Sequence, residues 1–187
     1  MHRFAQGFFF VLFILIGSSV VSADKFEGVP GYSFRHITDG TAAQLLPRVS
    51  TNGLVTWQGW DGDWEIYLYD GTSVEKITEN SVPDQRPSVN RHGDLAWTQN
   101  AGNERELMIR HDGIVTQITN DPVTNPVEER YPDVNDNGLV VWGRGTSSTG
   151  FGFANYDIST ETYTYIDSIG TYRPHVSNNN LIEVEGD

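Results

Sequence analysis

The chain has 187 residues, a net charge of −13 at pH 7 and no cysteine. Such an acidic surface repels nucleic acid and anionic lipid, which argues against both as partners. No disulfide framework holds the fold together, so stability must come from packing, for which aromatic residues at 12% of the chain supply large apolar area.

The first 23 residues predict an export signal. A positive start at Arg3 precedes an apolar run from Phe8 to Gly17, which is shorter than the roughly 20 apolar residues that span a bilayer. Val21-Ser22-Ala23 then places small or modest side chains where a signal peptidase cleaves. We therefore expect cleavage after Ala23, a domain over residues 24–187 and a secreted or periplasmic location. An uncleaved anchor is the alternative, because two valines lengthen the apolar run.

Four prolines mark an internal repeat with a period of 40, 45 and 42 residues: Pro47, Pro87, Pro132 and Pro174. The sixth position after each proline holds a residue that tolerates positive φ: Gly53, Gly93, Gly138 and Asn180. The tenth position holds Trp57, Trp97 and Trp142, whereas the fourth copy has Val184. We place the units at about residues 46–85, 86–130 and 131–172, with a partial unit over 173–187.

Each unit reads as four short strands separated by turns, with no long run of helical period. In the first unit the expected strands are Arg48–Ser50, Leu54–Gln58, Glu65–Tyr69 and Val74–Thr78. Asn-Gly and Asp-Gly pairs mark the connections, since they supply the positive φ angles of tight hairpins. We expect each proline to begin a strand, where its missing N–H does least harm. An isolated strand over residues 34–38 precedes the first unit.

Four strands per unit at this period predict an all-β fold of β-propeller blades. One four-stranded sheet cannot bury both of its faces alone, whereas radial stacking lets the three repeated tryptophans pack in the core between neighbouring sheets. A tandem array of other β units is the structural alternative.

The repeats resemble the TolB-like propeller superfamily over roughly residues 34–187. The resemblance is carried by Pro47-Arg48-Val49-Ser50-Thr51-Asn52-Gly53, Glu65-Ile66-Tyr67-Leu68-Tyr69-Asp70-Gly71 and Ile77-Thr78. It implies the fold but no single activity, because the superfamily includes periplasmic translocation components, peptidase-associated propellers, lyases and plain exported repeat proteins.

Three complete units are fewer than the six to eight blades that this resemblance implies. We therefore expect an open arc or a fragment of a longer protein. The alternative is a four-bladed ring, closed by pairing of the strand over 34–38 with strands near 173–186.

The sequence contains no nucleophile elbow, no His-Glu-x-x-His motif, no phosphate-binding glycine loop and no cysteine nucleophile. The histidines of the repeat region fall at unlike positions, without the spacing of zinc ligands. Asp61-Gly62-Asp63 and the run from Asp133 to Gly138 resemble calcium loops, but turn formation explains them. We expect no catalytic residue, no metal and no cofactor.

The first strand of each unit lines the channel of a propeller and carries the leading binding candidates. Alternation along that strand puts the repeated valines on one face and four dissimilar polar side chains on the other: Arg48, Ser88, Asp133 and His175. These four form a predicted ligand surface, or are simply polar residues facing channel water. Trp60 and Trp64 flank the Asp61-Gly62 turn as a second candidate, which would stack on a sugar ring or a partner's side chain unless they only pack locally.

The leading hypothesis is a non-catalytic exported propeller that binds or scaffolds a protein or glycan at the cell envelope. An enzyme of the polysaccharide-lyase or peptidase-associated type is the rival, and it needs His, Arg and carboxylates at one mouth of the channel. A third hypothesis is a structural repeat segment that self-associates through its exposed sheet edges.

Overall fold

The computed structural model describes residues 35–38, 40–102, 104–121, 127–146, 150–166 and 171–186. These ranges contain strands and turns only, so none of them holds a helix that is long and apolar enough to cross a membrane. The fold is all-β, as predicted. The export signal predicted for residues 1–23 lies outside the described residues and stays a prediction.

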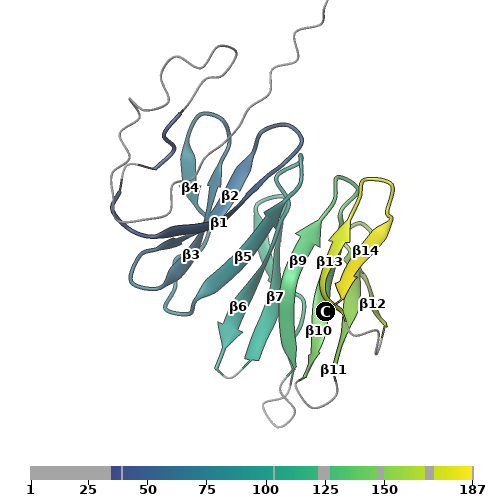
Figure 1. The fold of residues 1–187 in the computed structure, drawn as a ribbon. Coiled ribbons are helices and arrows are strands. Elements are labelled where there is room, and N and C mark those ends of the chain that lie inside the picture. Colours follow the sequence, from purple (N-terminus) through teal and green to yellow (C-terminus); the bar gives the residue numbers. More distant parts are fainter. Residues whose placement is uncertain are drawn as a thin grey trace, which may run out of the picture.

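Three antiparallel units of four strands follow one another along the chain, and the second and third are joined into one eight-stranded sheet (Figure 1). The first contains β1 (Gln44–Val49), β2 (Val55–Trp60), β3 (Trp64–Tyr69) and β4 (Val74–Lys76). The second contains β5 (Asp84–Val89), β6 (Leu95–Ala101), β7 (Glu104–His111) and β8 (Ile114–Gln117). The third contains β9 (Glu128–Val134), β10 (Leu139–Thr146), β11 (Gly150–Asp157) and β12 (Thr162–Ile166).

The fourth unit is half a blade, with only β13 (Thr171–Val176) and β14 (Ile182–Gly186). One parallel pairing, Arg105 with Glu128, joins the second and third units. We call β1, β5, β9 and β13 the inner strands, because they contact one another in succession at the centre of the arc (Figure 1). The described residues therefore form three complete propeller blades and half of a fourth.

Each repeated proline lies within its inner strand, so the expectation that it begins the strand is wrong. The first three prolines lie at a β-bulge, whereas in β13 the register shifts earlier and Pro174 pairs with Val184. The β1–β2 register shifts between Leu45 and Arg48, which leaves Leu46 and Pro47 together opposite Trp57. The same shift occurs in the second and third blades opposite their tryptophans. The residue before each of these prolines has positive φ: Leu46 (51°), Arg86 (57°) and Tyr131 (50°). The proline costs no ladder hydrogen bond there, because a bulge already breaks the ladder.

The repeated tryptophans are buried, as predicted, with exposed fractions of 1% for Trp57 and 0% for Trp97 and Trp142. Trp97 packs among apolar side chains of the first and second blades, and Trp142 among those of the second and third. Each indole N–H donates to a side chain of the inner strand 13 residues earlier: Gln44, Asp84 or Glu129. Trp57 differs from its equivalents, because Ile37, and not a neighbouring sheet, packs against its cluster.

The segment before the first blade does not form the expected strand, since residues 35–38 have no ladder partner. It lies over the first blade, where Ile37 packs beside Trp57 and the Arg35 guanidinium donates to the Tyr69 hydroxyl and to the Gly71 carbonyl, 2.9 Å away. In the described residues it therefore does not pair with β13 or β14. The arc is open in this part of the chain, and the closed four-bladed ring is not observed.

Replacing Trp97 by Ala removes an indole that two blades enclose, together with its 2.7 Å hydrogen bond to Asp84. We expect Trp97→Ala to lower the free energy of unfolding by about 3–5 kcal/mol, measured by urea titration. Trp60→Ala is the control, because Trp60 is 46% exposed and its loss should cost less than about 1 kcal/mol. Equal losses in the two variants would contradict the core assignment.

Candidate functional site

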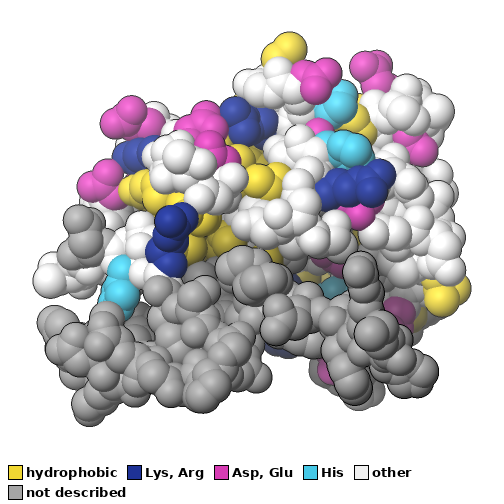
Figure 2. Space-filling model, turned by 90° about the horizontal axis from the view of Figure 1, so that it is seen from above, with side chains coloured by type: hydrophobic (Ala, Val, Ile, Leu, Met, Phe, Trp, Pro, Cys, Tyr) yellow, Lys and Arg dark blue, Asp and Glu magenta, His cyan; other side chains and the backbone are white. Residues whose placement is uncertain are grey.

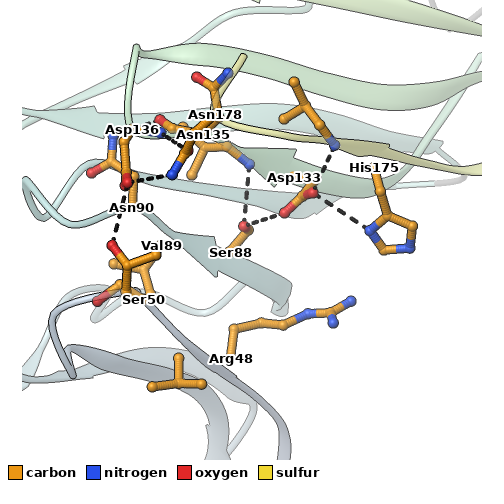
Figure 3. Close-up of a pocket in the computed structure, with 14 residues that line it drawn as sticks. Arg48, Ser50, Ser88, Val89, Asn90, Asp133, Asn135, Asp136, His175 and Asn178 are labelled. Atoms are coloured by element: carbon orange, nitrogen blue, oxygen red, sulfur yellow. Dashed lines mark hydrogen bonds and ion pairs between the residues drawn. The ribbon is translucent and has the colours of Figure 1, made fainter. Parts of the chain in front are cut away.

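Four side chains predicted from alternation meet around one hollow. Arg48, Ser88, Asp133 and His175 come one from each inner strand, and all four line a cavity of about 300 Å³ (Figure 3). We call this cavity the channel hollow. Its remaining lining comes from the repeated valines and from the turns that follow the inner strands.

The Asp133 carboxylate ties three inner strands together. Ser88 of β5 donates from Oγ to Asp133 Oδ1 at 2.9 Å, and the Val176 N–H of β13 donates to Oδ2 at 3.0 Å (Figure 3). Nδ1 of His175 lies 3.4 Å from the same Oδ2. Ser88 Oγ in turn accepts from the Val134 N–H at 3.2 Å. Both carboxylate oxygens are thus used to join blades.

Ser88, Asp133 and His175 have the residue types of a catalytic triad but not its geometry. In a triad the imidazole lies between the serine and the carboxylate and takes the serine proton. Here the carboxylate lies between the other two, and the Ser88 hydroxyl donates a hydrogen bond to Asp133. No hydrogen bond joins His175 to Ser88 within the described part of the chain. The arrangement does not activate the serine as a nucleophile.

Arg48 is the member of the set that remains available. Its side chain extends from β1 into the space below Ser88, toward the side where Asp133 and His175 lie (Figure 3). Among the described residues, none forms a hydrogen bond or ion pair with the Arg48 guanidinium, and the residue is exposed. Five N–H donors on a permanent positive charge suit a carboxylate or another oxyanion.

The turns after the inner strands hold one wall of the hollow through Asp136. Its carboxylate accepts from Thr51 of the first unit at 3.3 Å, from the Arg91 N–H of the second at 2.9 Å and from Asn178 of the fourth at 2.6 Å. Burial opposes ionisation of Asp136, but these hydrogen bonds hold its pKa below the usual value. Seen from above, the face formed by these turns mixes acidic, basic and histidine side chains (Figure 2). The Asp136 carboxylate is therefore an ionised group that its hydrogen-bond donors hold in place, and it is not free to act as an acid.

The other predicted aromatic pair lies outside the channel hollow. Trp60 and Trp64 pair directly across the β2–β3 hairpin, with ring centroids 5.4 Å apart at 79°. Trp60 is exposed at 46%, and neither ring lines the hollow. Edge-to-face packing is a sufficient reason for the pair, and a stacking role for it stays a prediction.

Sequence reasoning missed a second tier of side chains, two residues upstream on the inner strands: Leu46, Arg86, Tyr131 and Arg173. Arg86 and Arg173 both contact the Tyr131 ring, although they come from β5 and β13. The signal was present, because residues two apart on a strand share a face. The bulge that directs them was not predicted.

An acidic cluster between the second and third blades was also missed. Ligand oxygens of Glu106, Asp121 and Glu129 all lie within 4.8 Å of one another, which is the spacing of a cation site. Arg144 already binds this cluster, because its guanidinium donates to Glu129 and, at 2.6 Å, to Asp121. A guanidinium thus supplies the positive charge that a metal would bring.

Burial raises the pKa of Glu129 to about 8, even though the Arg144 charge acts in the opposite direction. Below that pH the folded state therefore holds a proton that the unfolded chain releases near the ordinary pKa of about 4.3. Folding stability contributed by this proton falls as pH rises between those two values. We expect urea titrations from pH 5 to 9 to show a shallower decline for Glu129→Gln than for the wild type. Parallel pH profiles would contradict the raised pKa.

Removing the Asp133 carboxylate leaves the Val176 N–H and the Ser88 hydroxyl without their acceptor. We expect Asp133→Ala to lower the free energy of unfolding by about 1–3 kcal/mol in a urea titration. Glu79→Ala is the control, since the Glu79 side chain is 87% exposed, and its effect should be near zero. An unchanged Asp133→Ala protein would show that the carboxylate does not join the blades.

Neither family models nor curated proteins match this sequence. Solved structures do match the fold. TolB from Acinetobacter baumannii superposes with a TM-score of 0.59 at 16% identity, over 79% of this chain and 39% of that one. A putative TolB from Agrobacterium tumefaciens gives a TM-score of 0.60 at 15% identity, over 76% of this chain and 54% of the other. The β-propeller domain of the Trilobed protease from Pyrococcus furiosus, which has an open velcro topology, gives 0.52 at 15% identity over 68% and 40%.

This chain spans about two fifths to about half of the length of the TolB structures it matches. Identities of 15–16% establish the shared fold and leave activity open. The blades, the central hollow and these superpositions together identify the fold as that of a TolB-like β-propeller.

Proposed function

We propose that this protein is a non-catalytic propeller module of the cell envelope that binds an acidic group of a protein or glycan partner in the channel hollow. Arg48 is the residue that contacts the ligand. The proposal rests on one difference between two charged side chains of the hollow. The Asp133 carboxylate is occupied by hydrogen bonds between blades, whereas the Arg48 guanidinium has no acceptor in the described part of the chain.

The rest of the hollow suits a carboxylate. His175 lies beside Asp133 with its side chain half exposed, so its ring can also contact an incoming group. The repeated valines also line the hollow, and Val89 and Val134 are buried in apolar clusters between the blades, which holds this wall rigid around an incoming group. An acidic group would accept charge-assisted hydrogen bonds from Arg48. The lining also carries the Asp133 and Asp136 carboxylates, but both are held by hydrogen bonds from neighbouring blades, so Arg48 is the charged group left to select an acidic ligand.

An envelope location is supported by two features of the chain. Residues 1–23 have the pattern of an export signal, and the fold is shared with TolB structures. The absence of cysteine from the sequence makes the protein indifferent to the redox state of its compartment.

An enzyme of the polysaccharide-lyase or peptidase-associated type is the second candidate. It is favoured by the convergence of Arg48, Asp133 and His175 on one hollow, which that hypothesis requires. The non-catalytic function is better supported, because Asp133 is committed to the Val176 N–H and to Ser88, and His175 forms no hydrogen bond with the Ser88 hydroxyl in the described part of the chain.

The test uses NMR titration of the full exported protein labelled with nitrogen-15. The probes are digalacturonate and an acetylated Glu-Glu dipeptide, with galactobiose and the Gln-Gln dipeptide as uncharged counterparts. We expect an acidic probe, and not its uncharged counterpart, to shift the Arg48 Nε–H and Val49 N–H signals. Arg48→Gln should weaken binding at least about tenfold, since it removes a charged hydrogen bond.

Arg110→Gln is the matched control, because Arg110 carries the same charge but pairs with Glu75 at 3.1 Å outside the hollow. It should bind like the wild type. Equal affinity of the Arg48→Gln variant, or no shift with any acidic probe, would refute the proposal. An unsaturated or cleaved product from either probe would instead establish the enzymatic alternative.

A further inference from the structure

Four arginines gather beside the inner strands, on the side of the channel hollow away from the turns. Arg86, Arg105, Arg130 and Arg173 come from β5, β7, β9 and β13, at or near the second tier of side chains. The whole chain has only 12 Lys and Arg residues against 25 Asp and Glu. One third of its permanent positive charges therefore lies in one place on an acidic protein.

The Tyr131 ring organises two of these arginines. The Arg86 guanidinium lies 4.8 Å from the ring centroid, and that of Arg173 lies 4.7 Å from it. Stacking holds a guanidinium flat and leaves its N–H donors directed outward in the plane. The two groups are thus oriented before any ligand arrives, which reduces the entropy that binding costs.

The backbone that presents this tier belongs to the fold. Arg86 and Tyr131 have positive φ, and Leu46 at the equivalent place in the first blade has it too. The bulge therefore turns the residue before the proline in β1, β5 and β9, whereas Arg173 stays in the ladder of β13, paired with Glu185. Besides Leu46, the tier consists of the Tyr131 ring and of two cations that contact it, Arg86 and Arg173.

The positive charges of the cluster exceed the negative charges that face them. Glu128 accepts from Arg105 at 2.9 Å and from Arg130 at 2.6 Å, so one carboxylate serves two guanidiniums. Among the described residues, no carboxylate forms an ion pair with Arg86 or Arg173. Burial, and then the neighbouring charges of Arg105 and Arg130, lower the pKa of Arg86. The like charges repel one another, and a bound anion would relieve that repulsion.

Two donors of the cluster are also unused. Nη1 of Arg86 and Nε of Arg105 are buried and have no hydrogen-bond partner. A buried donor without an acceptor costs free energy, and more so on a charged group. Both donors are satisfied if an oxyanion enters between the two guanidiniums.

We propose that Arg86, Arg105, Tyr131 and Arg173 form a binding site for one oxyanion, a carboxylate or a phosphate group, separate from the channel hollow. Arg86 and Arg105 donate to the anion from their unused nitrogens, and Tyr131 holds Arg86 and Arg173 in orientation. Glu128 remains paired with Arg105 and Arg130 and limits the site to a single small anion.

The experiment is an NMR titration of the full exported protein with its arginine side chains labelled with nitrogen-15. Inorganic phosphate and malonate are the two probes, each added at constant ionic strength against sodium chloride. We expect saturable shifts of the Arg86 and Arg105 Nε–H signals with at least one probe, and the relative affinities tell a phosphate site from a carboxylate site.

Arg86→Gln keeps the backbone N–H that donates to Gln58 at 2.9 Å and removes only the guanidinium. It should weaken binding of the preferred anion at least about tenfold. Arg110→Gln serves again as the control for net charge, and Arg48→Gln separates this site from the channel hollow. Both variants should bind the anion like the wild type.

Tyr131→Leu tests orientation by the ring, and we expect weaker binding with the charge unchanged. Circular dichroism and thermal unfolding confirm that each variant is folded. The proposal is overturned if neither anion gives a saturable shift, if Arg86→Gln binds as tightly as the wild type, or if Arg110→Gln loses as much affinity as Arg86→Gln. If the Arg48→Gln variant loses binding of digalacturonate or the Glu-Glu dipeptide but still binds phosphate or malonate, that result concerns the channel hollow and does not contradict this site.

Discussion

The bulge at the proline of β1, β5 and β9 is the constraint on which the rest of this fold depends. Two residues, Leu46 and Pro47 in the first blade, lie opposite one tryptophan, so the inner strand bends at the level of the indole. The residue three positions before the proline then accepts the indole N–H, as Asp84 does from Trp97 at 2.7 Å. Burial of a large ring, satisfaction of its one donor and the turn of the strand are a single repeated arrangement. It explains why proline and tryptophan recur together ten residues apart.

The same bulge decides what the centre of the arc presents. Without it, alternation would run unbroken from one tier to the next along each inner strand. With the bulge, the residue before the proline has positive φ and is displaced from the ladder. This residue is Arg86 in the second blade and Tyr131 in the third. The centre is polar for a structural reason, and some of its polar groups hold the blades together while others remain available.

The sequence predicted the period, the number of strands in each blade and the buried tryptophans, because each depends on residues repeated at fixed spacing. It also brought Arg48, Ser88, Asp133 and His175 to one surface, since strand alternation alone places them there.

The bulge was not predictable in the same way, because a proline within a strand reads equally well as the start of that strand. The engagement of Asp133 depends on a serine 45 residues away, and the packing of Ile37 on Trp57 depends on a segment outside the repeat. Contacts between units leave little trace in a single sequence. For that reason the sequence did not show that Asp133 is held by hydrogen bonds between blades while Arg48 is not.

The junctions between blades explain how one position of the repeat is free to bind. Ser88 accepts the Val134 N–H of the next inner strand, and Asp133 accepts that of Val176, so two successive junctions use the side chain that follows the proline as an acceptor.

In the first inner strand that position holds Arg48, which has no acceptor to offer. The first junction is held in other ways: Gln58 accepts the Arg86 N–H at 2.9 Å, and Ile66 and Leu68 pack against Trp97. The polar tie at this junction thus comes from Gln58 on β2 and not from the residue that follows the proline. The first two blades are therefore joined without any contribution from the Arg48 guanidinium, which faces the hollow as a permanent cation.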